Sequence, residues 1–167
     1  MVTPPLILTL RLDNVSQAYF NDLRIQHFPA AINYIPAHVS LFHHLPSDDQ
    51  TIQTALKEMA AHQCLTLEVT NVRNIGNGTA FIITSPELQM MHKQMQLIFA
   101  EHLIPQDRQK LWPHITIQNK VSALQAKQTT DALKEDFKPF IITGIGITAW
   151  FYLNGPWQKK EDFMFER

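Results

Sequence analysis

Two short stretches, His38-Val39-Ser40-Leu41-Phe42 and His114-Ile115-Thr116-Ile117-Gln118, decide the fold. In each of them polar and apolar side chains alternate, which is typical of a β-strand with one buried and one open face. We expect the apolar side chains to point towards a helix-covered core. Each histidine then shares the open face with the hydroxyl residue two positions later. The same alternation places Phe42 on the face of His38, and Gln118 and Lys120 on the face of His114.

The two stretches lie inside a longer internal repeat. Pro29 stands nine residues before His38, as Pro105 stands nine residues before His114. Further along, the sequence ALKE at residues 55–58 recurs at residues 132–135, with a shift of one residue. Chains that alternate strands and helices often look self-similar by chance. Several matches in the same order nevertheless favour two similar lobes that face each other.

The rest of the chain alternates predicted strands with predicted helices. Asp13 or Asn14 is the expected N-cap of the first helix, and Pro86 opens the third. The expected helices are residues 15–26, 50–62, 86–103 and 123–137. The expected strands are residues 6–12, 38–42, 65–72, 79–84, 115–120, 140–152 and 158–165.

Length and composition limit the possible functions. The 167 residues suit one domain, which we expect to span residues 1–167. With 14 basic and 15 acidic side chains the formal net charge is −1, which argues against a broad, non-specific nucleic-acid surface. The lone Cys64 excludes a disulfide within the chain and suits a reducing cytosol. The apolar residues 1–10 are too few to span a membrane and lack a basic signal-peptide start, so we expect a cytoplasmic protein without membrane contact.

Two imidazoles and two hydroxyls on converging faces suit the cleavage of a phosphodiester. One proton must leave the attacking oxygen and another must reach the leaving oxygen, and a neutral and a protonated histidine can do both near neutral pH. The hydroxyls can donate hydrogen bonds to the non-bridging phosphate oxygens. This chemistry requires no metal ion, the sequence contains no set of metal ligands at a known spacing, and we expect neither a metal nor another cofactor.

The paired motifs resemble the His-x-Thr/Ser-x signature of the 2H phosphoesterase superfamily, which includes the 2′-5′ RNA ligases and RNA 2′,3′-cyclic phosphodiesterases. The proline before the second histidine, Pro113, is also usual in that superfamily. The resemblance implies an α+β fold with two pseudo-twofold lobes, each an antiparallel sheet with helices outside, around a central cleft. It implies hydrolysis of a cyclic or 2′-5′ phosphodiester. By position, His38 and His114 would be the acid/base pair, and Ser40 and Thr116 would bind phosphate.

The chain departs from the family pattern after both motifs. Many RNA cyclic-phosphate members carry an arginine after the second motif, where this chain has Gln118-Asn119-Lys120. Lys120 is a candidate substitute, although lysine and arginine are not equivalent at a phosphate. After the first motif come His43 and His44, which we expect to be exposed in a loop, with the alternative that one of them lines the rim of the cleft.

Three aromatic residues near the motifs are candidate substrate-binding residues. Phe42, Tyr34 and Trp112 could each stack on a base, although core packing explains each of them equally well. Phe42 is the strongest of the three, because alternation places it on the face of His38. We expect the partner of the site to be a nucleotide or an RNA end, and we expect a monomer without an obligate protein partner.

Two other functions compete with a phosphodiesterase of RNA. A non-catalytic module that binds a nucleotide or RNA could use the same cleft, but binding alone would not need two imidazoles. A hydrolase acting on a cyclic phosphate outside RNA metabolism could reuse the whole histidine pair. The sequence disfavours the first alternative and does not separate the second from the main hypothesis, nor does it show which histidine is the base.

Overall fold

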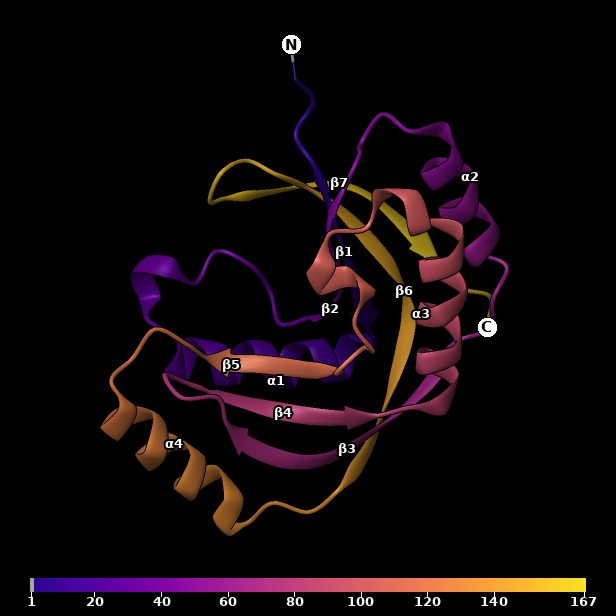
Figure 1. Ribbon diagram of the computed structural model, residues 1–167. Coiled ribbons are helices and arrows are strands. Elements are labelled where there is room, and N and C mark those ends of the chain that lie inside the picture. Colours follow the sequence, from indigo (N-terminus) through magenta and orange to yellow (C-terminus); the bar gives the residue numbers. More distant parts are fainter. Residues whose placement is uncertain (1) are drawn as a thin grey trace.

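A computed structural model describes residues 2–167, so Met1, the first residue of the apolar N-terminal segment, lies outside it. Seven strands and four α-helices follow one another along the chain, with β3 directly before β4 and β6 directly before β7 (Figure 1). The strands are β1 (Leu6–Leu12), β2 (Val39–Leu45), β3 (Leu65–Asn74), β4 (Thr79–Thr84), β5 (His114–Gln118), β6 (Phe140–Tyr152) and β7 (Trp157–Met164). The helices are α1 (Asn14–His27), α2 (Gln50–Met59), α3 (Pro86–Ile98) and α4 (Ala123–Glu135), with short 3-10 helices η1 (Ala30–Ile32), η2 (Ala100–His102) and η3 (Pro105–Arg108).

The strands pair antiparallel in the order β1-β2-β5-β4-β3-β6-β7, with a further pairing between β1 and β6. The long strand β6 pairs with β1 and β7 along one part and with β3 along the other. Two four-stranded lobes result, β2-β1-β6-β7 and β5-β4-β3-β6. They share β6 and meet again where Val39 of β2 pairs with Ile115 of β5. The expected two-lobed α+β fold is therefore confirmed, and each motif strand belongs to a different lobe.

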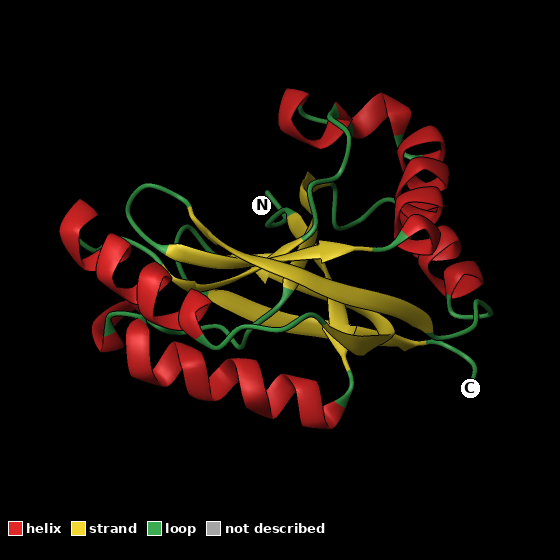
Figure 2. Cartoon of the chain, turned by 90° about the horizontal axis from the view of Figure 1, so that it is seen from below, coloured by secondary structure: helices red, strands yellow, loops and turns green. Residues whose placement is uncertain are grey.

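The helices form two groups that cover different parts of the sheet (Figure 2). Helix α1 packs against β5, and α4 packs against β3 and β4. Helix α2 contacts β7, and α3 places His92 against Phe42 of β2. Helix α1 follows β1 of one lobe yet covers a strand of the other, where its Phe20 meets Phe81 of β4 edge-on at 5.3 Å between ring centroids. The two lobes therefore share one hydrophobic core.

Side-chain caps fix where the four helices begin. Asp13 accepts a hydrogen bond from the Ser16 N–H at 2.9 Å, as expected of an N-cap, and also one from Thr143 of β6 at 3.0 Å. The same capping role falls to the residues just before the other three helices, namely Asp49, Ser85 and Ser122. Helix α1 is thus anchored to the strand that the two lobes share.

Strand β2 carries an extra residue directly after the hydroxyl of its motif. Thr9 of β1 pairs with Ser40, but the preceding residue, Leu8, pairs with Phe42, so Leu41 is a β-bulge. A bulge reverses the alternation of faces beyond it. Phe42 is consequently fully buried in the core, whereas the uninterrupted alternation of the sequence placed it on the face of His38.

Strand β5 carries a bulge at the equivalent position. Ala80 of β4 pairs with Thr116, but Thr79 pairs with Gln118, so Ile117 is the extra residue. Gln118 is therefore buried on the helix side, where it donates to Thr129 of α4 at 2.8 Å, and does not share the face of His114. The repeat of the sequence thus extends to a repeated irregularity of the backbone.

Candidate active site

The two motif histidines are oriented in the same way. Nδ1 of His38 lies 2.9 Å from the carbonyl oxygen of Pro36, and Nδ1 of His114 lies 2.7 Å from that of Trp112. Each carbonyl belongs to the residue two positions before its histidine. A carbonyl can only accept a hydrogen bond, so Nδ1 carries the hydrogen in both rings. In both histidines Nε2 is therefore the nitrogen available for chemistry.

The strand register brings each histidine close to the hydroxyl of the other motif. Val39 pairs with Ile115 between antiparallel strands. One step to either side of this pair, the register sets His38 opposite Thr116, and Ser40 opposite His114. All four side chains lie on the same face because opposed residues of an antiparallel pair point the same way. The two motifs therefore converge on one site, as the sequence predicted.

Both imidazoles are held in their neutral form. Desolvation lowers the pKa of His38 from its ordinary 6.5 to about 4. The Pro36 carbonyl raises it in part, and repulsion from Arg24, together with that from His114 and His43 when these rings are protonated, lowers it further. Desolvation also lowers the pKa of His114, again against a raising effect of its carbonyl partner. In the free protein neither ring carries a charge at neutral pH, and a bound anion would favour protonation of one of them.

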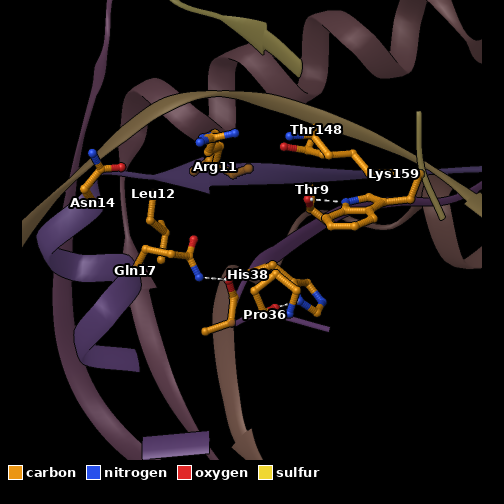
Figure 3. Close-up of a pocket in the computed structure, with 12 residues that line it drawn as sticks. Thr9, Arg11, Leu12, Asn14, Gln17, Pro36, His38, Thr148 and Lys159 are labelled. Carbon is orange, nitrogen blue, oxygen red and sulfur yellow. Dashed lines mark hydrogen bonds between the residues drawn. The ribbon is translucent and has the colours of Figure 1, made fainter. Parts of the chain in front are cut away.

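A cavity of about 280 Å³ opens beside His38 (Figure 3). Arg11 and Lys159 line it, and both form ion pairs with Asp162, so the group keeps one net positive charge. Thr9 forms part of its wall and accepts a hydrogen bond from Nε1 of Trp150 at 2.9 Å. The cavity combines a net cation, hydroxyls and an aromatic surface, which suits a phosphorylated ligand with an aromatic group.

Trp157 at the start of β7 was not predicted as a site residue. Its ring centroid lies 5.2 Å from that of His38 and 6.0 Å from that of Trp150. The sequence carried a weak signal for it, because the strand expected at residues 158–165 began next to this tryptophan. Pairing of β7 with β6 is what brings Trp157 to the cleft, and that pairing is not readable from local sequence.

A second cavity, of about 300 Å³, opens beside His114. Its wall includes Ser40, His43, Lys110 and Trp112. The Trp112 ring lies against His114 with 4.3 Å between centroids, and the Arg73 guanidinium lies 5.6 Å from the Trp112 centroid. The structure therefore places Trp112, a candidate from the sequence, directly at the site.

Three other candidates lie elsewhere. Phe42 is in the core, stacked on His92 with 4.6 Å between ring centroids. Tyr34 is 66% exposed in the loop after η1 and lines neither the cavity beside His38 nor the one beside His114. Lys120 follows β5 in a left-handed turn with φ of 57°, which ends the strand at Gln118 and leaves the side chain exposed. Lys120 lines neither the cavity beside His38 nor the one beside His114.

Arg24 of α1 is a buried cation that the sequence interpretation overlooked. It is only 5% exposed and donates to the carbonyl oxygen of Thr116 and to Asn33 Oδ1, both at 2.9 Å. No carboxylate in residues 2–167 forms an ion pair with it, and desolvation lowers its pKa to about 10. The helical spacing of Phe20, Leu23 and Arg24 already placed this arginine on the buried face of α1. Its unpaired charge lies directly behind the second motif.

Residues 2–167 contain neither a cluster of metal ligands nor a membrane-spanning helix. No group of three or more His, Cys, Asp or Glu side chains in this range is arranged to hold a metal ion. No helix of the described chain is long and apolar enough to cross a membrane.

Known proteins share this fold. A family model described as the 2′-5′ RNA ligase superfamily matches residues 12–155. The fold is similar to that of E. coli LigT in complex with 3′-AMP, with a TM-score of 0.62, 14% identity and 99% of each chain covered. It is also similar to TT0787 of Thermus thermophilus, with a TM-score of 0.66, 12% identity and coverage of 96% of this chain and 97% of that one. A structure described as a phosphoesterase matches with a TM-score of 0.59 and 14% identity, covering 99% of both chains. A search of curated proteins found no match.

Proposed function

Because the chain belongs to the 2′-5′ RNA ligase superfamily, we propose that it is a metal-independent phosphodiesterase that hydrolyses a cyclic 2′,3′-type or a 2′-5′ phosphodiester of a nucleotide or RNA end. The family match confirms the resemblance to the 2H phosphoesterases. The observation that carries the proposal is the matched orientation of His38 and His114, whose Nε2 atoms are both left free by Nδ1–carbonyl hydrogen bonds. The complex of LigT with 3′-AMP supports a nucleotide as the class of ligand.

The two histidines have different electrostatic environments, which supports different roles. Desolvation lowers the pKa of His38, to about 4, more strongly than that of His114, so His38 is the histidine that more readily stays neutral and is assigned as the general base. His114 is desolvated less and suits the general acid, which takes up a proton when the substrate phosphate binds. In the hydrolytic direction His38 would accept a proton from water, and His114 would give one to the leaving oxygen.

Ser40 and Thr116 are the proposed phosphate ligands. Each hydroxyl lies opposite the histidine of the other motif in the register of β2 and β5. A phosphate between the two Nε2 atoms would therefore have one hydroxyl on each side, to donate hydrogen bonds to its non-bridging oxygens. The segment after β5 has no arginine, and Arg24 supplies a guanidinium from behind Thr116.

The two lobes act on substrate as one unit in this proposal. They share β6 and a common core, and each contributes one histidine and one hydroxyl. Neither lobe alone holds the acid and the base together.

Turnover of 2′,3′-cyclic nucleotides and of 2′-5′ dinucleotides tests the proposal. We expect wild type to cleave at least one class, and His38→Ala and His114→Ala each to lower kcat by about 100-fold or more, because each removes a proton-transfer group. His44→Gln is the matched control, since that side chain is exposed beside the site. If either alanine variant keeps full activity, the mechanism is wrong; tight binding without turnover across both classes would support a binding module.

A further inference from the structure

A third imidazole, that of His43, is fixed beside the site by a buried carboxylate. Nδ1 of His43 lies 2.7 Å from Oδ1 of Asp107, whose side chain is 1% exposed. The other oxygen, Oδ2, accepts the backbone N–H groups of His43 and His44 at 2.8 and 3.3 Å. A carboxylate with these donors fixes both the position and the tautomer of the ring, so Nδ1 carries hydrogen and Nε2 is an acceptor. The partner of Nε2 is the side-chain amide of Gln106 at 3.5 Å, a long contact that a hydroxyl of the ligand can replace.

The bulge at Leu41 aims this ring into the cleft. Beyond a bulge the faces of a strand exchange, so His43 comes to the side of Ser40 while Phe42 turns into the core. His43 lines the cavity of about 300 Å³ that also contains His114, and its side chain is 39% exposed. Its neighbour His44 is exposed and does not line that cavity.

Anchoring the loop does not explain the imidazole. Asp107 ties η3 to β2 through two backbone N–H groups, and these bonds would form with any side chain at position 43. Phosphodiester cleavage by His38 and His114 does not require a third ring either. A partly exposed histidine held by a buried carboxylate is therefore a feature that neither the fold nor the proposed reaction uses.

The chemistry of His43 and Asp107 selects one class of ligand group. The two side chains do not make a metal site, because the described residues supply no third ligand. A ring whose Nδ1–H is donated to a carboxylate presents the Nε2 lone pair as a hydrogen-bond acceptor. The cavity around it is otherwise rich in donors, from Lys110 and the amides of Gln106 and Gln109, and it has the Trp112 ring as an aromatic wall. An acceptor among these groups matches a hydroxyl of the ligand, and the aromatic wall matches a sugar or a base.

We propose that His43, held by Asp107, is a specificity-determining residue whose Nε2 accepts a hydrogen bond from a ribose hydroxyl of the nucleoside on the His114 side of the scissile phosphate. This inference rests on the proposed function and adds to it a preference for ribose on that side. His43 does not take part in proton transfer to the reacting oxygens. Asp107 is a positioning residue that acts through His43.

The test uses a 2′-5′-linked diadenosine monophosphate and two analogues, each with the free hydroxyls removed from one of its two riboses. Dissociation constants by calorimetry and kcat/KM are measured for wild type, His43→Phe, His43→Gln and the matched control His44→Gln. We expect wild type to bind only one analogue about tenfold more weakly than the parent compound, which corresponds to the loss of roughly one hydrogen bond. His43→Phe should lose a similar factor on the parent compound and nothing more on that analogue, whereas His44→Gln should behave as wild type.

The outcomes separate this inference from the proposed function. If the parent compound binds but neither it nor a 2′,3′-cyclic nucleotide is cleaved, the phosphodiesterase proposal fails, while the dissociation constants still test the role of His43. If wild type does not distinguish the three compounds, does not bind them, or distinguishes them as well after His43→Phe, the inference is wrong. Thermal unfolding of each variant shows that it is folded, and His43→Gln, which keeps a polar side chain, repeats the test if His43→Phe does not fold.

Discussion

Arg24 and His38 illustrate how single buried charges set the chemistry of neighbouring groups. The arginine has no carboxylate partner among the ion pairs of residues 2–167, and it reaches the backbone of Thr116 from the helix side of the strand. Its charge is one of the causes that lower the pKa of His38. A cation buried without a partner is costly to fold, which makes it a strong candidate for a functional rather than a structural role.

Arg24→Gln is expected to raise the pKa of His38, because it removes a positive charge that disfavours the imidazolium. The acid limb of the kcat/KM profile should then move to higher pH, and kcat/KM at neutral pH should fall about tenfold through weaker attraction of phosphate. A pH–rate profile measures both effects. Arg24→Lys keeps the charge, so the acid limb should stay within a few tenths of a pH unit of wild type; an equal shift in both variants would contradict the electrostatic explanation.

The pKa of His38 also links stability to pH. The unfolded chain takes up a proton near pH 6.5, whereas the folded protein resists protonation down to about pH 4. Between these values the unfolded state binds more protons, so His38 stabilises the fold above pH 6.5 and this stabilisation is lost as the pH falls towards 4.

In urea unfolding, the free energy of unfolding of wild type should fall by about 1 to 2 kcal/mol more than that of His38→Gln between pH 6.5 and pH 5. One group contributes roughly 1.4 kcal/mol per pH unit. Because the pKa of His114 is also lowered, the stability of His38→Gln keeps some dependence on pH. Parallel curves for the two proteins would show that His38 is not protected from protonation.

At the scale of elements, the two β-bulges mark what could and could not be read from the sequence. Alternation correctly assigned the faces of His38, Ser40, His114 and Thr116, because these residues precede the bulges. Beyond the bulges the same rule failed, since nothing in a leucine or an isoleucine distinguishes an extra residue from a regular strand position.

The missed residues depend on long-range packing. Trp157 reaches His38 only through the pairing of β7 with β6, and Asp107 reaches His43 from a 3-10 helix that lies 64 positions away in sequence. The expected third helix was continuous to residue 103, whereas α3 ends at Ile98 and a 3-10 turn follows. Local propensity does not contain these contacts, although it located the strands that carry the acid/base pair.

Gly78, the last residue of the turn before β4, allows the close approach of β4 to β5. A Cβ atom at this position would collide with the backbone of Gln118 and Asn119, which cannot move aside as a flexible side chain would. We expect Gly78→Ala to destabilise the protein by about 2 to 3 kcal/mol and to displace the end of the strand that carries His114. Denaturant unfolding and kcat/KM measure the two effects.

Gly76→Ala is the matched control for this substitution. Gly76 lies in the same turn with φ of 97° and has open space around its Cα, so only backbone strain of about 1 kcal/mol is expected there. The activity of the folded Gly76→Ala variant should equal that of wild type. A larger loss of stability at Gly76 than at Gly78 would argue against the close approach.

At the scale of the molecule, all three tryptophans of the chain gather at the site. Trp112 lies against His114, Trp157 lies near His38, and Trp150 lines the cavity beside His38. Trp150 and Trp157 come from β6 and β7, and Trp112 comes from the loop before β5. Their convergence therefore reflects the meeting of the two lobes.

Intrinsic fluorescence should therefore report on ligand binding. Saturation with a nucleotide is expected to quench the emission, because bases stack on or desolvate these rings. Trp112→Phe should remove the part of the change that arises in the cavity beside His114, while His44→Gln should leave the titration unchanged. An emission spectrum that does not change at saturating ligand, shown by calorimetry to be bound, would contradict this placement.

The hydroxyls of Ser40 and Thr116 approach the site from opposite lobes, and this has a stereochemical consequence. The two non-bridging oxygens of a nucleoside phosphodiester are already distinct because the riboses are chiral, and between two unlike hydroxyls they would also have different hydrogen-bond partners. Serine on one side and threonine on the other, with its extra methyl group, make the pseudo-twofold imperfect where the phosphorus would lie. The protein can therefore tell the left-hand oxygen of a phosphate from the right-hand one, so a sulfur atom in place of one of them would have a different effect from a sulfur atom in place of the other.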